Sequence, residues 1–385
     1  LGLNLYVDGR FGSFSTNRLD KKELETLITN GIESTRYLAV DESRMLADPA
    51  RYYKGGKPDL QLFDKKLYEV NPDDKVAIAR AAAEEVLGKD ERIISVDSSY
   101  SDGEGSSYRL ISNGFEGESK STWFSVSASV SIKGEGEARP QDYWYDSALF
   151  YDKLTKTGIG AKALERVLRK LGQKKAKSGK YTMVVDPMNV GNLLSPMLSA
   201  LYGSALQQKN SFLMDKLDTK VASDLFTLRD EPHAIGANGS RYFDNEGVAT
   251  EPRTVFDKGV LKTYFIDTYN GKKMDIAPTI SAPSRLILTP GDKDLNGLVA
   301  DIKQGILVTG FNGGNSNSST GDFSYGIEGF LIEDGKLTQP VNEMNVTGNM
   351  VTLWNSLVAV GNDPQPNRSW QIPSLVFEGV DFSGL

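Results

Sequence analysis

His233 is the only histidine of the chain and the first residue whose chemistry could support catalysis. It lies in the run Asp230-Glu-Pro-His, so a Ser-His-Asp hydrolase site could be assembled from it, an acidic neighbour and one of many serines. The chain has no Gly-x-Ser-x-Gly turn of the kind that exposes a nucleophilic serine. The sequence therefore favours a loop histidine bonded to backbone or to a carboxylate.

Four carboxylates in the second half of the chain form another candidate set: Asp244, Glu246, Asp322 and Glu328. Two carboxyl groups that lie close together can act as general acid and general base. Spacing along the sequence does not establish that any two of these four are neighbours. Asp322, directly after a glycine-rich loop, fits a turn or capping role better than a catalytic one.

Metal chemistry is limited by composition. With no cysteine and one histidine, a single chain cannot form a disulfide, a thiolate metal site or a histidine-rich metal site. Residues Asp102–Ser106 alternate acidic side chains and glycine, which leaves a calcium loop open as an alternative, although the EF-hand spacing is absent. We predict a solvent-exposed hairpin turn at these residues.

Length and charge narrow the class of protein further. A chain of 385 residues is long enough for two or three domains, and its 38 glycines indicate many turns. No apolar run approaches the roughly 20 residues that span a bilayer. The net charge of -7 argues against nucleic-acid binding through a basic surface. The chain starts at Leu1 without methionine or a signal-like segment, so we expect further residues to precede it.

The elements that would position these residues can be predicted from local patterns. Leu3–Tyr6 and Arg10–Thr16 read as strands joined at Asp8-Gly9, and Asp20–Ser34 reads as a helix with Asp20 as its N-cap. A second helix, Pro72–Leu87, begins with Pro-Asp-Asp and stops at a glycine. The N-terminal region therefore opens with two strands and a helix.

The following segment changes from helical periodicity to a period of two. In Phe124–Ile132 apolar residues alternate with serines, which predicts a strand with one buried and one wet face. The aromatic patch Asp142–Asp146 fits either a binding surface or burial against the sheet. Gly160–Leu171 predicts a third helix, and the basic run Lys174–Lys180 predicts a linker between domains rather than a nucleic-acid site.

The second half opens with a strand at Tyr181–Val185, followed by Asp186-Pro187 and a predicted helix over Val190–Lys209. Gln304–Pro366 is the most informative stretch. There a strand over Gly305–Gly310 precedes the loop Asn312–Gly321, whose glycines are suited to positive φ.

That loop delivers Thr320, Gly321 and Asp322 to the next strand. Asp334-Gly335 then predicts a tight hairpin. A strand over Met344–Val346 follows, and an apolar run over Leu353–Val360 ends at Gly361, Asn362 and Asp363.

Three runs in this stretch, TGDFSYGIEGFLIEDG, PVNE and VAVGND, are similar to those of the TldD/PmbA family, metalloproteases once called modulators of DNA gyrase. A weaker likeness extends through SFLMDKL, FDNEGV and KGVLKTYFIDTYNGKKM, so it covers most of residues 181–377. Within the family the chain resembles PmbA, also called TldE, more than TldD.

The resemblance implies a zinc site that this chain does not keep. In TldD-like relatives a helix carries His-Glu-x-x-x-His, whose histidines bind zinc and whose glutamate acts as general base, and a cysteine follows later. The matching positions here are Leu194, Ser195, Ser199 and, within a residue or two, Ile372. Neither Leu194 nor Ile372 can donate a lone pair to a metal.

We therefore predict an α+β protein with an N-terminal domain of strands and about three helices, residues 1–179, and a larger, mainly-β C-terminal domain with a central helix, residues 180–385. The resemblance implies a cytoplasmic, non-catalytic subunit that needs no cofactor of its own. Its expected partners are a TldD-like zinc subunit and an unfolded or small peptide, and neither nucleic acid nor membrane. The segments Thr320–Asp322 and Gly361–Asp363 are its predicted peptide-binding or scaffold residues.

Two alternatives stay open at the level of sequence: a metal-independent or carboxylate-metal peptidase active by itself, and a binding protein that modulates gyrase. The sequence also leaves a homodimer open.

Overall fold

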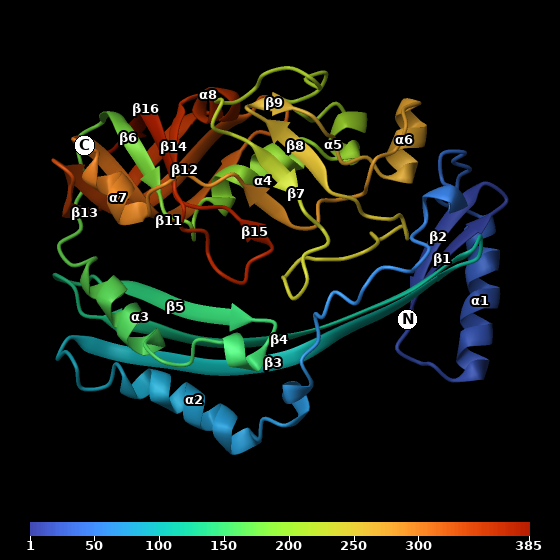
Figure 1. Cartoon of the computed structure of the whole chain (residues 1–385), viewed down its shortest axis with the longest axis horizontal. Helices are drawn as coiled ribbons and strands as arrows, with labels where there is room; N and C mark the ends of the chain where they lie inside the picture. Colours follow the sequence, from blue (N-terminus) through green and yellow to red (C-terminus); the bar gives the residue numbers. More distant parts are fainter.

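The computed structural model describes all 385 residues. Figure 1 shows a small N-terminal strand–helix unit, a three-stranded sheet covered by helices, and a mainly-β part that contains the C-terminus. This α+β architecture confirms the predicted fold class. The predicted division between residues 179 and 180 falls at the first residues of a central strand of the C-terminal sheet.

The N-terminal unit follows the predicted pattern closely. Strands β1 (Gly2–Val7) and β2 (Arg10–Ser15) pair antiparallel across Asp8-Gly9, and both turn residues have positive φ. Helix α1 (Lys21–Arg36) is capped by a side-chain oxygen of the aspartate before it, as expected. This unit packs on helix α6 (Thr268–Met274), where Asp41 accepts a hydrogen bond from Tyr269 Oη at 2.9 Å.

A three-stranded antiparallel sheet forms the next layer. It consists of β3 (Ile93–Ile111), β4 (Phe115–Ile132) and β5 (Gln141–Ala148), in that order. Helices α2 (Pro72–Glu84) and α3 (Ile159–Leu168) pack on one face with the apolar side chains of β4. The alternating serines of β4 lie on the other face, which confirms the predicted strand.

The predicted hairpin turn at Asp102–Ser106 is wrong. These residues lie inside β3 and pair without interruption with β4, and the turn is at Asn113-Gly114, where Gly114 has φ of 111°. Gly103 and Gly105 take extended backbone, and the Trp123 ring lies against Gly103. Asp102 is held by Lys75 Nζ at 2.7 Å, so it serves an ion pair between β3 and α2.

The C-terminal part contains a six-stranded sheet in the order β13-β12-β11-β6-β16-β14. Strand β13 also pairs with the end of β16, so the sheet curls toward closure at one end. The strands are β6 (Gly179–Val185), β11 (Gln304–Ser316), β12 (Asp322–Glu333), β13 (Lys336–Asn349), β14 (Leu357–Val360) and β16 (Leu375–Ser383).

A smaller five-stranded sheet and short helices complete this part. The strands of this sheet run in the order β15-β10-β7-β8-β9. Their bounds are β7 (Leu228–Asp230), β8 (Arg253–Asp257), β9 (Val260–Leu261), β10 (Leu286–Leu288) and β15 (Trp370–Gln371). The remaining helices are α4 (Gly191–Ser199), α5 (Gly203–Gln207), α7 (Leu295–Ala300) and α8 (Met350–Asn355), and single 3-10 turns occupy Pro49–Arg51, Lys65–Tyr68 and Tyr151–Lys153. Helix α4 lies in the largest apolar core, as expected of the predicted central helix.

Three predicted boundaries in this part are wrong. The helix expected over Val190–Lys209 breaks into α4 and α5, because Tyr202 is extended and the Gly203 amide bonds the Phe265 carbonyl at 2.7 Å. The run Leu353–Val360 begins inside α8 and becomes strand only at Leu357. The loop expected over 312–321 is shorter, because residues up to Ser316 stay in β11 through irregular pairing with β12.

Candidate functional site

The segment that would carry the family's chemistry is α4, and a buried turn positions it. Asp186, directly after β6, accepts hydrogen bonds at Oδ1 from the Asn189 amide at 3.0 Å and from Asn189 Nδ2 at 2.7 Å. Asn189 Nδ2 also donates to the Thr309 carbonyl of β11 at 2.8 Å. The start of α4 is thereby fixed against two neighbouring strands of the sheet.

The four motif positions divide into two kinds of environment. Leu194 of α4 and Ile372 after β15 are 0% and 4% exposed and belong to the same apolar core. Ser195 and Ser199, one helical turn apart, lie on the exposed face of α4. Two buried hydrocarbon side chains and two hydroxyls do not fit a zinc ion, which prefers Cys, His and carboxylate ligands. No three His, Cys, Asp or Glu side chains gather elsewhere as a metal site.

The segment Thr320–Asp322 is a hydrogen-bonded corner at the start of β12. Asn349, the N-cap of α8, donates to the Thr320 carbonyl at 2.8 Å and to the Asp322 carboxylate at 2.9 Å. The Thr320 hydroxyl also donates to this carboxylate at 2.7 Å, and the hydrogen bonds from Asn349 and Thr320 hold the pKa of Asp322 below its usual range. Gly321 has φ of 80°, and a Cβ there would lie 3.0 Å from the Phe212 ring. Through these contacts the segment connects β12 to α8 and to the loop after α5.

The segment Gly361–Asp363 likewise connects neighbouring elements of the C-terminal part. Asp363 accepts from the Leu295 amide of α7 at 2.9 Å and from the Ser374 amide and hydroxyl at 2.9 and 2.8 Å. Asn362 donates through Nδ2 to the Asp292 carbonyl at 2.9 Å. The two predicted segments share no hydrogen-bond partner, so the structure does not join them into one polar site.

The remaining sequence candidates are His233 and the four carboxylates. His233 Nε2 lies 3.1 Å from Thr250 Oγ1, and burial lowers the pKa of the histidine. Its hydrogen-bond partner is therefore Thr250 and not a carboxylate, and no serine hydroxyl hydrogen-bonds to it. Asp244 accepts three backbone amides, and Glu246 accepts from the backbone and hydroxyl of Thr268. The Glu246 amide is one of the donors to Asp244, and burial together with the Asp244 charge raises the pKa of Glu246, but no two of the four carboxyl groups share a hydrogen bond.

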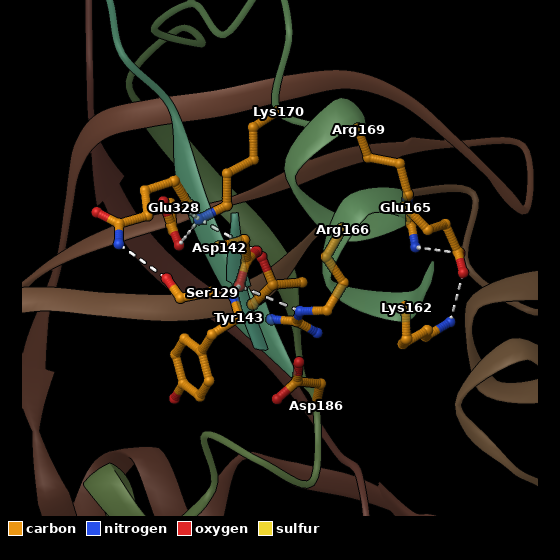
Figure 2. A network of polar contacts seen from close by, with 12 residues as sticks. Ser129, Asp142, Tyr143, Lys162, Glu165, Arg166, Arg169, Lys170, Asp186 and Glu328 are labelled. Carbon is orange, nitrogen blue, oxygen red and sulfur yellow. Dashed lines mark hydrogen bonds and ion pairs between the residues drawn. The ribbon is translucent and has the colours of Figure 1, made fainter. Parts of the chain in front are cut away.

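A charged network that the sequence did not predict lies between the three-stranded sheet and the C-terminal part (Figure 2). Asp142 of β5 lies 3.2 Å from both Arg166 Nε of α3 and Lys170 Nζ. Lys170 Nζ also lies 2.7 Å from Glu328 of β12. Figure 2 shows Asp186 beside Arg166 at the lower edge of this network.

The network's members are buried or nearly so, and this burial shifts one of them strongly. Burial raises the pKa of Asp186 to about 6, although the hydrogen bonds from Asn189 and the positive charge of Arg166 oppose the shift. The signal in the sequence was the spacing of Arg166 and Lys170, four residues apart at the end of one amphipathic helix. The network connects α3 to the turn that positions α4, and it exposes no nucleophile.

The comparisons with known proteins agree with this architecture. Residues 65–171 match the model of the PmbA/TldA metallopeptidase central domain, and residues 178–384, more than half of the chain, match the model of its C-terminal domain. The chain belongs to the PmbA/TldD family. The predicted resemblance is thereby confirmed.

Within this family the chain is similar to PmbA proteins. It is 28% identical over 392 residues to the metalloprotease PmbA homolog of Haemophilus influenzae, covering 100% of this chain and 85% of the relative. A solved Bacteroides thetaiotaomicron protein, described as a candidate modulator of DNA gyrase, is 73% identical with a TM-score of 0.99, covering 100% of this chain and 88% of that one. TldE from Thermococcus kodakarensis shares the fold at 21% identity and a TM-score of 0.84, covering 100% and 89%.

One further property bears on the class of protein. None of the helices is both long enough and apolar enough to cross a membrane.

Proposed function

We propose that this PmbA/TldD-family chain is the non-catalytic, PmbA/TldE-like subunit of a two-subunit zinc peptidase in the cytoplasm. The observation that carries the proposal is that the chain keeps the fold of the family and lacks its zinc ligands. Leu194 and Ile372 are packed in the core where the family's metal-binding pattern would place donors. A TldD-like partner would supply the zinc and the general base.

The contribution of this chain is structural. Its C-terminal sheets would help to enclose a peptide chamber, and strands at sheet edges, such as β14, can pair with an extended peptide through main-chain hydrogen bonds. Main-chain pairing makes little demand on side chains, which suits unfolded or small peptides of varied sequence.

Reconstitution tests the proposal. The purified chain, a cognate TldD-like subunit and their mixture are each incubated with a disordered peptide, with and without a chelator. We expect cleavage that requires the partner and is abolished by the chelator, and well under one zinc per chain in the isolated protein. A Ser199→Ala variant serves as a matched control, since it should change neither the zinc content nor the joint activity.

The outcomes separate the alternatives. Chelator-resistant cleavage by the chain alone would support a metal-independent peptidase, and zinc that is lost on mutation of Ser199 would support a metal site of its own. Retention of gyrase but not of a TldD-like protein in a pull-down would support a gyrase-binding protein.

A further inference from the structure

A polar pocket of about 340 Å³ lies between the three-stranded sheet and the C-terminal part. Ser121 of β4 lines it from the sheet. Ser240, Arg241, Ser284 and Ser369 line it from three loops of the C-terminal part. No carboxylate lines it, so Arg241 supplies the only formal charge of its walls.

The loops of this pocket are held rigidly. Arg241 Nε donates to Ser284 Oγ at 2.8 Å, and Nη2 donates to the carbonyls of Ala282 and Pro283 at 2.8 and 3.1 Å. The side chains of Ser240 and Ser284 belong to residues that are only 5% and 8% exposed. Gly239, with φ of 86°, allows the loop to approach, because a Cβ there would lie 2.6 Å from that of Ser369.

Several donors of the pocket remain without a partner in the chain. Arg241 Nη1 donates no hydrogen bond, and the hydroxyls of Ser121 and Ser369 bond nothing. None of the three is among the buried atoms that lack a partner, so each of these atoms retains contact with solvent. The Asp230 carboxylate accepts two backbone amides, from Ser284 and Arg285, and it lies close enough to Arg241 to feel its charge but shares no hydrogen bond with it.

A guanidinium edge beside free hydroxyls is a recognition site for an anion of carboxylate size. The wet face of the sheet continues from the pocket along β5. Arg368, the neighbour of Ser369, lies 4.8 Å over the Tyr145 ring, and Tyr145 shares the wet face of the sheet with Ser121. From Tyr145 to Leu149, which also lines the pocket, the strand direction covers roughly 13 Å, about four residues of extended peptide.

We propose that this pocket binds a carboxylate and that, in the peptidase assembly, the carboxylate is the C-terminus of a short peptide. The carboxylate would bond Arg241 Nη1 and the hydroxyls of Ser121 and Ser369, and the preceding residues would run along the sheet beside Tyr145 and Arg368. The second half of this statement rests on the proposed function, whereas the pocket's preference for a carboxylate does not.

Calorimetric titration of the isolated chain tests the binding directly. The ligands are N-acetyl-tetraalanine with a free C-terminus, the same peptide as C-terminal amide, acetate and inorganic phosphate. We expect the free acid to bind at least tenfold more tightly than the amide. It should also bind more tightly than acetate, because acetate is too short to contact Tyr145 and Arg368. Equal binding of acid and amide would overturn the proposal, and equal binding of peptide acid, acetate and phosphate would overturn the peptide assignment.

Variants locate the site. Ser121→Leu breaks no side-chain hydrogen bond and should weaken binding of the free acid at least tenfold without lowering the melting temperature. Arg241→Gln should abolish the preference for acid over amide, with melting measured because Arg241 also holds two carbonyls. Ser131→Leu is the matched control on the same face of β4, roughly 30 Å along the strand, and should leave binding unchanged. Unchanged binding by Ser121→Leu would overturn the proposal, whatever the reconstitution with a zinc subunit shows.

Discussion

Lys170 Nζ lies 2.7 Å from the Glu328 carboxylate, between side chains that are 10% and 17% exposed and residues 158 positions apart in the chain. The same ammonium lies 3.2 Å from Asp142. One lysine therefore neutralises two carboxylates where α3 and β5 meet β12. Removing Lys170 would leave Asp142 and Glu328 largely desolvated and without the ammonium that pairs with both.

We expect Lys170→Met to lower the free energy of unfolding by about 3 kcal/mol, because breaking a buried ion pair leaves uncompensated charge. Lys170→Met/Glu328→Gln should recover part of this loss. Lys175→Met is the control, since Lys175 pairs with Glu343 at 3.7 Å in an exposed position and should cost less than about 1 kcal/mol. Urea unfolding measures all three variants, and equal effects of the two single substitutions would contradict the prediction.

Asp186 predicts a pH dependence of stability. Its pKa in the folded chain, about 6, lies above the ordinary value of 3.8 because burial disfavours the charged form. The folded state therefore binds the Asp186 proton more tightly than the unfolded state does. The contribution of this proton to the free energy of unfolding is fully present below about pH 4 and is lost as the pH rises through 6. Asp186→Asn keeps an acceptor for Asn189 and does not ionise.

At pH 8 we expect Asp186→Asn to be more stable than the natural chain by about 2–3 kcal/mol, at about 1.4 kcal/mol per pKa unit. At pH 3.5 the two should be nearly equal. Thermal unfolding across this range gives the comparison, and parallel curves for the two proteins would show that Asp186 does not titrate in the predicted window.

Gly321 is the one residue of its segment with positive φ, at 80°. Gly321→Val should cost on the order of 1–3 kcal/mol through backbone strain and through contact of its side chain with the Phe212 ring. Gly105→Val is the control, because Gly105 is extended in β3 and its Cβ would meet only Ser121 Oγ at 3.9 Å. An unchanged melting temperature of Gly321→Val, with unchanged partner binding, would show the segment to be a simple connection.

Substitution of Asp363 should lower the peptidase activity of the reconstituted assembly without loss of zinc. Asp363→Ala removes the acceptor of the Leu295 and Ser374 amides, which should cost about 2–3 kcal/mol and loosen α7 from the strand β16. In the reconstituted assembly we expect lower activity and an unchanged zinc content of the partner. Asn362→Ala, which removes one exposed hydrogen bond, should have a much smaller effect. A loss of zinc with Asp363→Ala would place this residue in the metal site.

The sequence predicted those elements whose determinants are consecutive residues. The cap at Asp20, the turn at Asp334-Gly335 and the alternation of β4 are each decided by a few neighbours, and all three are present. The break after α4 depends on Phe265, which lies more than sixty residues away in sequence, so local periodicity could not reveal it. The turn expected at Asp102–Ser106 failed because long-range pairing with β4 outweighed its turn-like composition.

For the candidate site, too, the sequence revealed some residues and only the fold revealed others. Leu194 and Ile372 were recognised through a family motif, and the structure places both in one core, which no spacing rule could have established. Glu328 was considered only as one of four carboxylates that could pair for acid–base chemistry, and its true partner Lys170 went unrecognised because it looks like an ordinary surface charge until the fold brings the two together.

Strand β16, nine residues long, pairs with β6, β13 and β14, and each of these strands precedes it in the chain. On the ribosome, β6 is made about two hundred residues before its neighbour β16 exists, so the C-terminal sheet cannot close until β16 has been made. A chain released without its final ten residues would have every motif of the family and still expose the edge of its central strand. Nascent chains that have not yet made β16 should therefore be the species that chaperones engage.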